Sequence, residues 1–274
     1  MSIDPRRIIG EILGQPAPSA SNLASADHLC PFIHATCVKR AKYVEGPFPV
    51  CSAFEFRRRK ELSLEDLVCT CPKRFFGIDL LEDVVEHCWP EKEAPEHPQL
   101  VHEVRMKGVG TVDLVVADCE PGSKTVRQFV SVELQAVDIT GTYADAYLAL
   151  LRGDTLETRK GHSFNWANVR KRFASQLIQK SFFHQQWRTK MACIVQDSFF
   201  ERFRRDLKFH EVGASEAHVI FLIYRYAKTE SGDRYNLVLD RVMGTTHSSL
   251  MNQSLYSLVP ERSEFCKQIV KRLT

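Results

Sequence analysis

Two neighbouring stretches decide the fold of this chain: residues 110–118 read GTVDLVVAD, and residues 130–138 read VSVELQAVD. Each alternates with period two, which predicts a β-strand with one apolar face. In the first strand Asp113 lies opposite the apolar face, and in the second strand Glu133 and Gln135 do so together. A turn signal at 120–123 (EPGS) separates the strands, so we expect both carboxylates and the amide to meet at one sheet edge. The apolar face of the first strand is predicted to comprise Val112, Leu114 and Val116.

These residue types suit a metal site, although their spacing alone does not require one. Mg²⁺ takes carboxylate oxygens as ligands together with waters and phosphate oxygens. A cation held there could lower the pKa of a bound water and stabilise charge on a phosphorus atom. Alternating strands also carry solvent-facing charges routinely, so Asp113 and Glu133 fit ordinary surface positions as well on spacing alone.

The patterns around the two strands predict an α/β fold with a central mixed sheet flanked by helices. A short helix is predicted over Pro5–Leu13. Another is expected to start near Ser63, where Ser-x-x-Asp is an N-cap signal. The second acidic strand is expected to span 128–137, and further strands are expected at 101–107, 191–195, 218–226 and 235–243. Further helices are expected at 76–88, 143–151, 165–187, 198–208 and 261–272.

The bulk composition bounds the class of protein. A chain of 274 residues fits one large domain, or a core with one small annex. The net charge is +3, from 37 basic and 34 acidic residues, and a charge this small does not by itself indicate a polyanionic partner. Any contact with DNA must therefore come from local clusters of basic residues. The beginning of the chain lacks a signal-peptide pattern, and the nine cysteines are an odd number. We therefore expect a cytoplasmic protein whose cysteines are free or bind metal.

The chain is predicted to divide into an N-terminal annex, residues 1–74, and a catalytic core, residues 75–274. The annex is rich in Cys, Pro and Arg and poor in apolar residues, so a bound metal would contribute much of its folding free energy. Four thiolates satisfy a closed site for iron or zinc, although the irregular spacing also fits buried free thiols. Cys69 complicates the choice, because in an extended segment it would point the same way as Cys71. The candidate ligands are Cys30, Cys37, Cys51 and Cys71.

The acidic strands resemble the core of the PD-(D/E)xK nucleases, through GTVD at 110–113, VELQAVD at 132–138 and the following ITGT at 139–142. They are similar to the NotI/EagI type of restriction endonuclease, in which Gln stands at the usual Lys position. The resemblance spans roughly residues 30–187 and includes the cysteine strings CPF, VCS and CPKRF.

This resemblance implies roles for particular residues. Asp113 and Glu133 would bind Mg²⁺, and Gln135 would orient the attacking water or a phosphate oxygen. Glu103 matches an additional family acid, although it also fits a surface strand carboxylate. The four candidate cysteines would hold a single iron in a rubredoxin-like site, with Cys71 taken over Cys69 because of its CPKRF context. Iron rather than zinc rests on the resemblance alone.

The function predicted in this way is a type II restriction endonuclease that cleaves double-stranded DNA with Mg²⁺. The resemblance further implies a GC-rich palindromic site, which a homodimer would meet with one active site per strand. Two other functions stay open: a repair-type PD-(D/E)xK nuclease, and a metal-binding DNA-binding protein with an inactive nuclease fold. Basic residues that could contact phosphates, or simply form solvated faces, are Arg57, Arg58, Arg59, Arg170 and Lys171.

Overall fold

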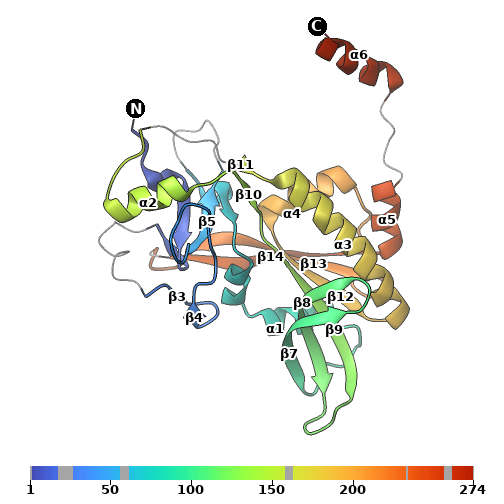
Figure 1. Cartoon of the computed structure of the whole chain (residues 1–274). Helices are drawn as coiled ribbons and strands as arrows, with labels where there is room; N and C mark the ends of the chain where they lie inside the picture. The colour runs from blue at the N-terminus through green and yellow to red at the C-terminus, as the bar shows by residue number, and fades with distance from the viewer. Residues whose placement is uncertain are drawn as a thin grey trace.

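A six-stranded mixed sheet forms the centre of the computed structural model (Figure 1), which describes residues 2–17, 27–55, 62–157, 163–232, 234–255 and 261–273. Its strand order is β14-β13-β12-β9-β8-β7. The pairs β9–β12 and β12–β13 are parallel, and the others are antiparallel. The strands are β7 (Pro98–Met106), β8 (Gly110–Cys119), β9 (Val126–Gln135), β12 (Lys190–Gln196), β13 (Val219–Lys228) and β14 (Tyr235–Thr245).

Helices cover both faces of this sheet, as expected from the sequence. Strand β12 lies between two parallel neighbours and is buried at every position, which explains its almost continuous apolar run. Ala192 and Ile194 pack in the same core cluster as α1 (Leu80–Cys88). Cys193 and Val195 pack in the opposite cluster with α3 (Trp166–Trp187) and α4 (Asp197–Leu207). The prediction of a central mixed sheet flanked by helices is therefore confirmed.

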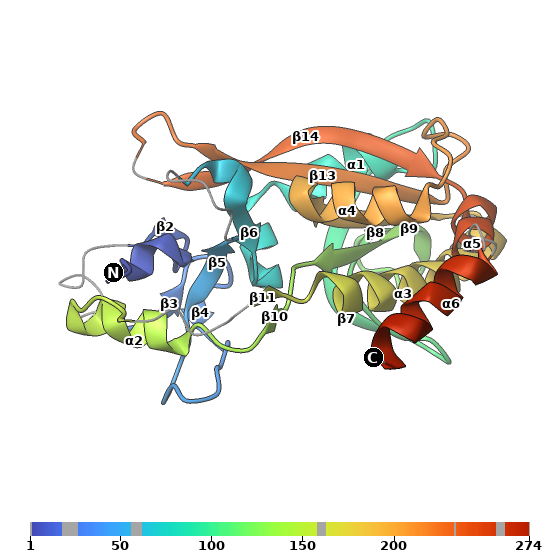
Figure 2. The same cartoon turned by 90° about the horizontal axis from the view of Figure 1, so that it is seen from above.

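A second, smaller sheet is built by the N-terminal part of the chain (Figure 2). Its strand order is β2-β1-β5-β6, and its neighbouring strands run antiparallel. The strands are β1 (Ile9–Ile12), β2 (Gln15–Pro16), β5 (Val50–Phe54) and β6 (Leu67–Cys69), beside a hairpin of β3 (Leu29–Cys30) and β4 (Ala35–Thr36). Short 3₁₀ turns are η1 (Pro5–Arg7), η3 (Leu64–Asp66) and η4 (Pro72–Gly77), and β10 (Ile139–Thr140) pairs with β11 (Ser163–Phe164).

The predicted helix over Pro5–Leu13 is wrong. Only Pro5–Arg7 form a 3₁₀ turn, and the chain then enters strand β1. The run Ile8-Ile9-Gly10 contains two β-branched residues that are buried, which favours a strand in a sheet over a helix. Leu13 and Gly14 then take positive φ angles of 50° and 74°, and this turn pairs β1 with β2.

The N-terminal sheet also buries more apolar side chains than the sequence indicated. Ile8, Ile9, Phe48 and Val50 are buried in one cluster with residues of α2 (Ala144–Arg152), a helix that comes later in the chain. Burying one such side chain contributes about 1.5–3 kcal/mol, so this cluster stabilises the annex without a metal. The boundary at residue 74 stays a prediction.

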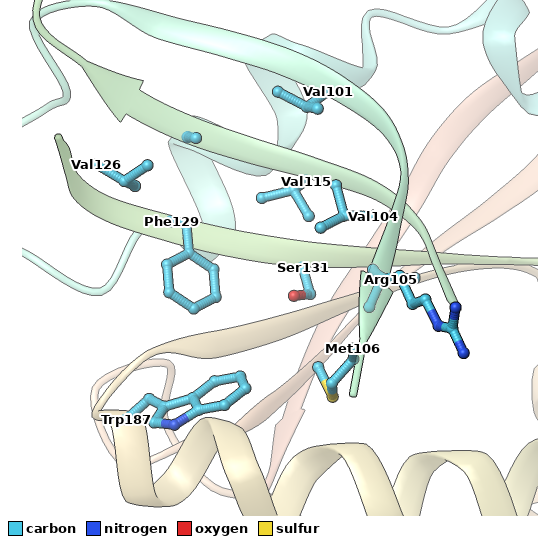
Figure 3. Close-up of a pocket in the computed structure, with 11 residues that line it drawn as sticks. Val101, Val104, Arg105, Met106, Val115, Val126, Phe129, Ser131 and Trp187 are labelled. Carbon is cyan, nitrogen blue, oxygen red and sulfur yellow. The ribbon is translucent and has the colours of Figure 1, made fainter. Parts of the chain in front are cut away.

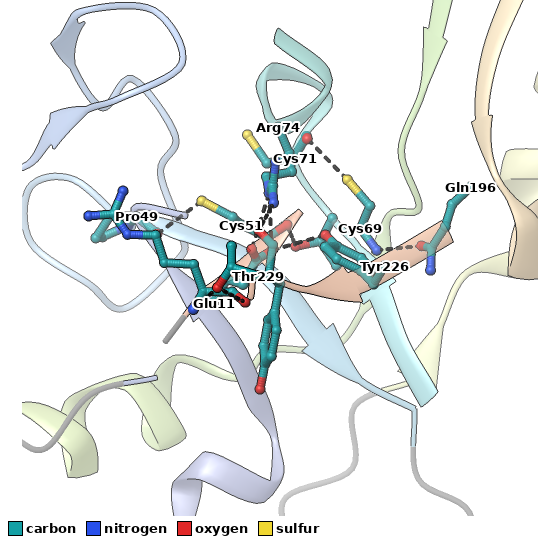
Figure 4. A network of polar contacts seen from close by, with 12 residues as sticks. Glu11, Pro49, Cys51, Cys69, Cys71, Arg74, Gln196, Tyr226 and Thr229 are labelled. Carbon is teal, nitrogen blue, oxygen red and sulfur yellow. Dashed lines mark hydrogen bonds and ion pairs between the residues drawn. The ribbon is translucent and has the colours of Figure 1, made fainter. Parts of the chain in front are cut away.

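A buried ion pair ties the N-terminal sheet to the central one (Figure 4). Arg74 Nε lies 3.1 Å from Glu11 Oε1, and Arg74 Nη2 donates to the carbonyl of Tyr235 at 2.6 Å. Tyr226 on β13 donates its hydroxyl to Glu11 at 3.0 Å. Burial raises the pKa of Glu11, and Arg74 acts against that rise. The pair therefore links β1 to strands β13 and β14 through a buried carboxylate and a buried guanidinium.

Two more helices follow β14. Helix α5 (His247–Leu255), which the sequence patterns did not indicate, lies against α3. Helix α6 (Arg262–Leu273) has no buried residue and projects from the body in Figure 1. None of the helices in the described ranges combines the length and the apolar character needed to cross a membrane. The expected helix start at Ser63 is confirmed only as a 3₁₀ turn, in which the Ser63 amide donates to Asp66 Oδ2 at 3.1 Å.

Candidate active site

A polar pocket lies at the end of β9, where strands β8 and β9 separate. We call it the carboxylate pocket, and its volume is about 260 Å³. Leu114 and Val132 form the last residue pair between β8 and β9, whereas β8 remains paired with β7 down to Gly110. The separation opens a gap beside the carboxylates. The lining residues are Thr111, Asp113, Glu133, Leu134, Gln135, Arg172, Phe173 and Gln176.

Asp113 lies where β8 and β9 separate. Its side chain there accepts a hydrogen bond from the backbone of β9, in place of the backbone pairing between the two strands. Its Oδ2 accepts a hydrogen bond from the Leu134 amide at 2.9 Å, beyond the last residue pair of these two strands. The bond fixes the carboxylate toward β9, while Oδ1 accepts no hydrogen bond from the residues the structure describes. The same region corrects one expectation. Val112 does not share a face with Leu114, and it packs instead in a separate apolar cluster with Val115, because the strand turns as it leaves β9.

Glu133 faces the same pocket and is 6% exposed. Its Oε1 contacts the ammonium group of Lys180, which comes from α3 and is 2% exposed. Lys180 also donates to the Thr111 carbonyl at 2.8 Å. Burial raises the pKa of Glu133 to about 7, and the Asp113 charge adds to this, whereas Lys180 acts in the opposite direction.

The sequence analysis did not identify Lys180 as a site residue, although its position in the sequence of α3 is informative. The buried stripe of α3 includes Val169, Phe173, Leu177, Lys180 and His184, so the lysine occupies a position where helical spacing predicts an apolar residue. A lysine is almost never fully buried without a partner. That combination could have indicated an acidic partner across the helix–sheet interface.

The other two predicted site residues differ in their placement. Gln135 lines the carboxylate pocket, and its Nε2 donates to the Ala136 carbonyl. Glu103 on β7 stands opposite Asp113 in the register, between the pairs His102–Leu114 and Val104–Val112. It is exposed and is not among the described residues that line the pocket. Its φ of 54° is unusual for a residue inside a strand.

The cysteines gather at the base of the N-terminal sheet. Cys30, Cys37 and Cys71 line one hollow of about 290 Å³. Cys51 is buried nearby, and burial together with the neighbouring Glu11 and Cys71 raises the pKa of its thiol. Among the described residues, however, no three His, Cys, Asp or Glu side chains lie close enough to hold a metal ion.

Cys69 does not point the same way as Cys71, contrary to expectation. Strand β6 ends at Cys69, whose thiol is fully buried in the main core and donates to the Cys71 carbonyl at 3.3 Å. Its amide donates to Gln196 on β12 at 2.8 Å. Cys71 starts the η4 turn and lines the hollow instead, because Pro72 ends the extended segment.

The predicted DNA-contacting residues lie away from the carboxylate pocket or outside the described residues. Arg57, Arg58 and Arg59 belong to the latter group. Arg170 forms an ion pair with Asp206 of α4, and both Arg170 and Lys171 line a different hollow between α3, α4 and α5. The basic residue at the carboxylate pocket is Arg172, which pairs with Asp138.

A larger hollow lies on the same side of the sheet beyond the end of α3 (Figure 3). Its volume is about 380 Å³, and its lining is almost entirely apolar, including Val101, Met106, Phe129 and Trp187. Ser131 and Arg105 are its only polar residues, so the described lining offers no carboxylate or amide for hydrolytic chemistry. The carboxylate pocket is therefore the better candidate for the reaction.

Comparison with known proteins identifies a family for this chain. The family described as "Restriction endonuclease NotI" matches residues 19–237, which cover strands β5 and β6 of the N-terminal sheet, both carboxylate strands and β13. No curated protein matches the chain. The family match confirms the resemblance that the acidic strands and the cysteine strings indicated. Since it covers well over half of the sequence, this chain belongs to the NotI family of restriction endonucleases.

Proposed function

We propose that this chain is a type II restriction endonuclease that hydrolyses a phosphodiester bond in each strand of double-stranded DNA, with Mg²⁺ as its cofactor. The observation that carries the proposal is the meeting of Asp113 and Glu133 in one polar pocket. The family match supports site-specific cleavage of DNA.

The donor set of the pocket fits Mg²⁺. The hydrogen bond from Leu134 uses Asp113 Oδ2, and the contact with Lys180 uses Glu133 Oε1. Asp113 Oδ1 and Glu133 Oε2 accept no hydrogen bond within the described ranges, so one oxygen of each carboxylate is available to a cation. Oxygen ligands of this kind, completed by water and phosphate, are what Mg²⁺ prefers.

When bound, Mg²⁺ would lower the pKa of a water and offset the charge that develops on the phosphate. The chain itself would contribute position and charge. Asp113 is held toward β9 by the Leu134 amide, and Glu133 is held by Lys180. Gln135 lines the same pocket but its neutral amide cannot act as a base, so we assign it the orientation of the water or of a phosphate oxygen.

We extend the proposal to the assembly and the cysteine site. A palindromic, GC-rich target would be met by a homodimer acting on DNA in the cytoplasm. Cys30, Cys37, Cys51 and Cys71 would hold one structural iron or zinc, and what supports this is that three of them line one hollow with Cys51 buried beside it. The burial of Cys69 in the main core supports Cys71 as the fourth ligand.

The proposal is tested by incubating the purified chain with unmethylated plasmid DNA of mixed sequence. We expect discrete fragments with Mg²⁺, none with a chelator, and loss of cleavage in Glu133→Gln. Glu86→Gln, an exposed carboxylate on α1, is the matched control and should cleave normally. Diffuse nicking would favour a repair-type nuclease, and cleavage that survives Glu133→Gln would refute this active site.

A further inference from the structure

Lys180 is one of the buried charged residues in the described part of the chain. It is 2% exposed on the inner face of α3, where its neighbours Phe173 and Leu177 are apolar. Its ammonium group has two contacts, the Glu133 carboxylate and the Thr111 carbonyl. One contact is on β9 and the other on β8, so Lys180 bridges the two strands beyond their last residue pair.

Stability does not explain this arrangement. A buried ion pair contributes little net stability, because desolvation offsets the attraction, and well-packed apolar residues often do as well. The charge of Lys180 can be buried at this position because Glu133 pairs with it. Glu133 in turn lines the polar pocket together with Asp113 and does not point into the apolar core. The pair is therefore best explained by the pocket.

Among the described residues that line the pocket, one carries a positive charge, and that charge is already paired. The position that carries Lys in most PD-(D/E)xK nucleases is Gln135, which is neutral. Arg172 lines the pocket, but its guanidinium is paired with Asp138. Lys180 is the remaining cation in contact with a residue of the pocket, within the ranges that the structure describes.

We propose that Lys180 is a positioning residue that supplies, from helix α3, the positive charge that Gln135 cannot supply from β9. It acts through Glu133: holding Oε1 leaves Oε2 facing the pocket, and its contact with Thr111 fixes β9 relative to the strand that carries Asp113. This inference rests on the proposed function, because the charge matters only if the pocket hydrolyses DNA.

The test compares Lys180→Met and Lys180→Gln with Lys190→Met. Lys190 is a matched control, because it is also buried, whereas its hydrogen bonds to described residues go to the carbonyls of Ala214 and Trp89 and not to a carboxylate. Loss of one preorganised group of an active site lowers turnover by about 100-fold or more, so both Lys180 variants, which no longer hold Glu133 through a charge, should lose about that much at saturating Mg²⁺. Lys190→Met should cleave at the normal rate per folded molecule.

Two further readouts separate positioning from mere support of the fold. Gln135→Lys placed in the Lys180→Met background should restore cleavage about tenfold, since it returns the charge to the pocket from the other side. The affinity for Mn²⁺ at alkaline pH should rise a few fold in Lys180→Met, because a cation next to the site has been removed. Both measurements are made on the full chain, with thermal unfolding as the check on folding.

The outcomes are distinct. Normal cleavage by Lys180→Gln, failure of Gln135→Lys to restore activity, or a parallel loss of Mn²⁺ affinity and cleavage would each overturn the inference. If the wild-type chain does not cut DNA with Mg²⁺, the proposed function fails. The Mn²⁺ affinities of wild type and Lys180→Met then still decide whether the lysine acts on a cation site.

Discussion

Binding of a divalent cation to the carboxylate pocket should depend steeply on pH near neutrality. A carboxylate must lose its proton before it can bind a metal, and burial raises the pKa of Glu133 to about 7. The ionised form is populated above that pKa, so affinity is present at higher pH and is lost as the pH falls through it. An ordinary glutamate, with a pKa near 4.3, would remain ionised over the same range.

The size of the effect follows from the ionised fraction. With a pKa of about 7, Glu133 is roughly 91% ionised at about pH 8 and roughly 9% ionised at about pH 6. The apparent association constant for a cation that needs the ionised form should therefore fall about tenfold between these pH values. No histidine is among the described residues that line the pocket, so Glu133 is the group expected to titrate there in this range.

The assay is calorimetric titration of the wild-type chain with Ca²⁺ or Mn²⁺ in the absence of DNA, at several pH values. Binding avoids the separate pH dependence of the hydrolysis step. Glu133→Gln is the control, because its amide keeps the shape without a titrating proton and should give weak binding with no pH dependence. An affinity for wild type that changes less than twofold over this range would refute the reasoning.

Three other predictions concern the stability of the fold and the cysteine site. Arg74→Met should lower the free energy of unfolding by about 3–5 kcal/mol in urea, because it leaves Glu11 buried without its cation, and a loss under about 1 kcal/mol would contradict this. Burial lowers the pKa of His184 to about 4, below its ordinary value near 6.5, so stability should fall by about 2 kcal/mol from about pH 7 to about pH 5 as the unfolded chain takes up the proton. His184→Phe should remove that part of the acid sensitivity, and an unchanged pH profile would exclude it. Cys71→Ser should abolish bound iron or zinc, measured by elemental analysis, whereas Cys69→Ser should retain it, and the reverse result would exchange the two ligands.

The alternation of residue types predicted much of the acidic strand pair. In β9, Val130 and Val132 pack in one core cluster, and Glu133 and Gln135 line the pocket on the other side, as period two requires. The rule failed at Val112, where β8 leaves its neighbour and turns. Alternation describes a paired strand, and it cannot say where pairing stops.

The residues that the sequence did not reveal are those whose role depends on distant segments. Lys180 meets Glu133 across 47 residues, so its place in the buried stripe of α3 could indicate an acidic partner but could not identify that partner as Glu133. Helical spacing could have shown that Arg170 and Arg172 lie on different faces of α3, but only the position of β9 shows which face overlooks the carboxylates. The strand at Ile9 was missed for the same reason, since its partners Val50–Phe54 lie far along the chain.

The packing of α2 against Ile8 and Val50 has a consequence for the order of events during synthesis. The N-terminal strands leave the ribosome first, but the helix that covers them is encoded beyond both carboxylate strands. Until residue 152 has emerged, the apolar side of the small sheet lacks the helix that covers it. A fragment cut at residue 74 would remain in that uncovered condition permanently, so the two parts are expected to be obtained in soluble form only together.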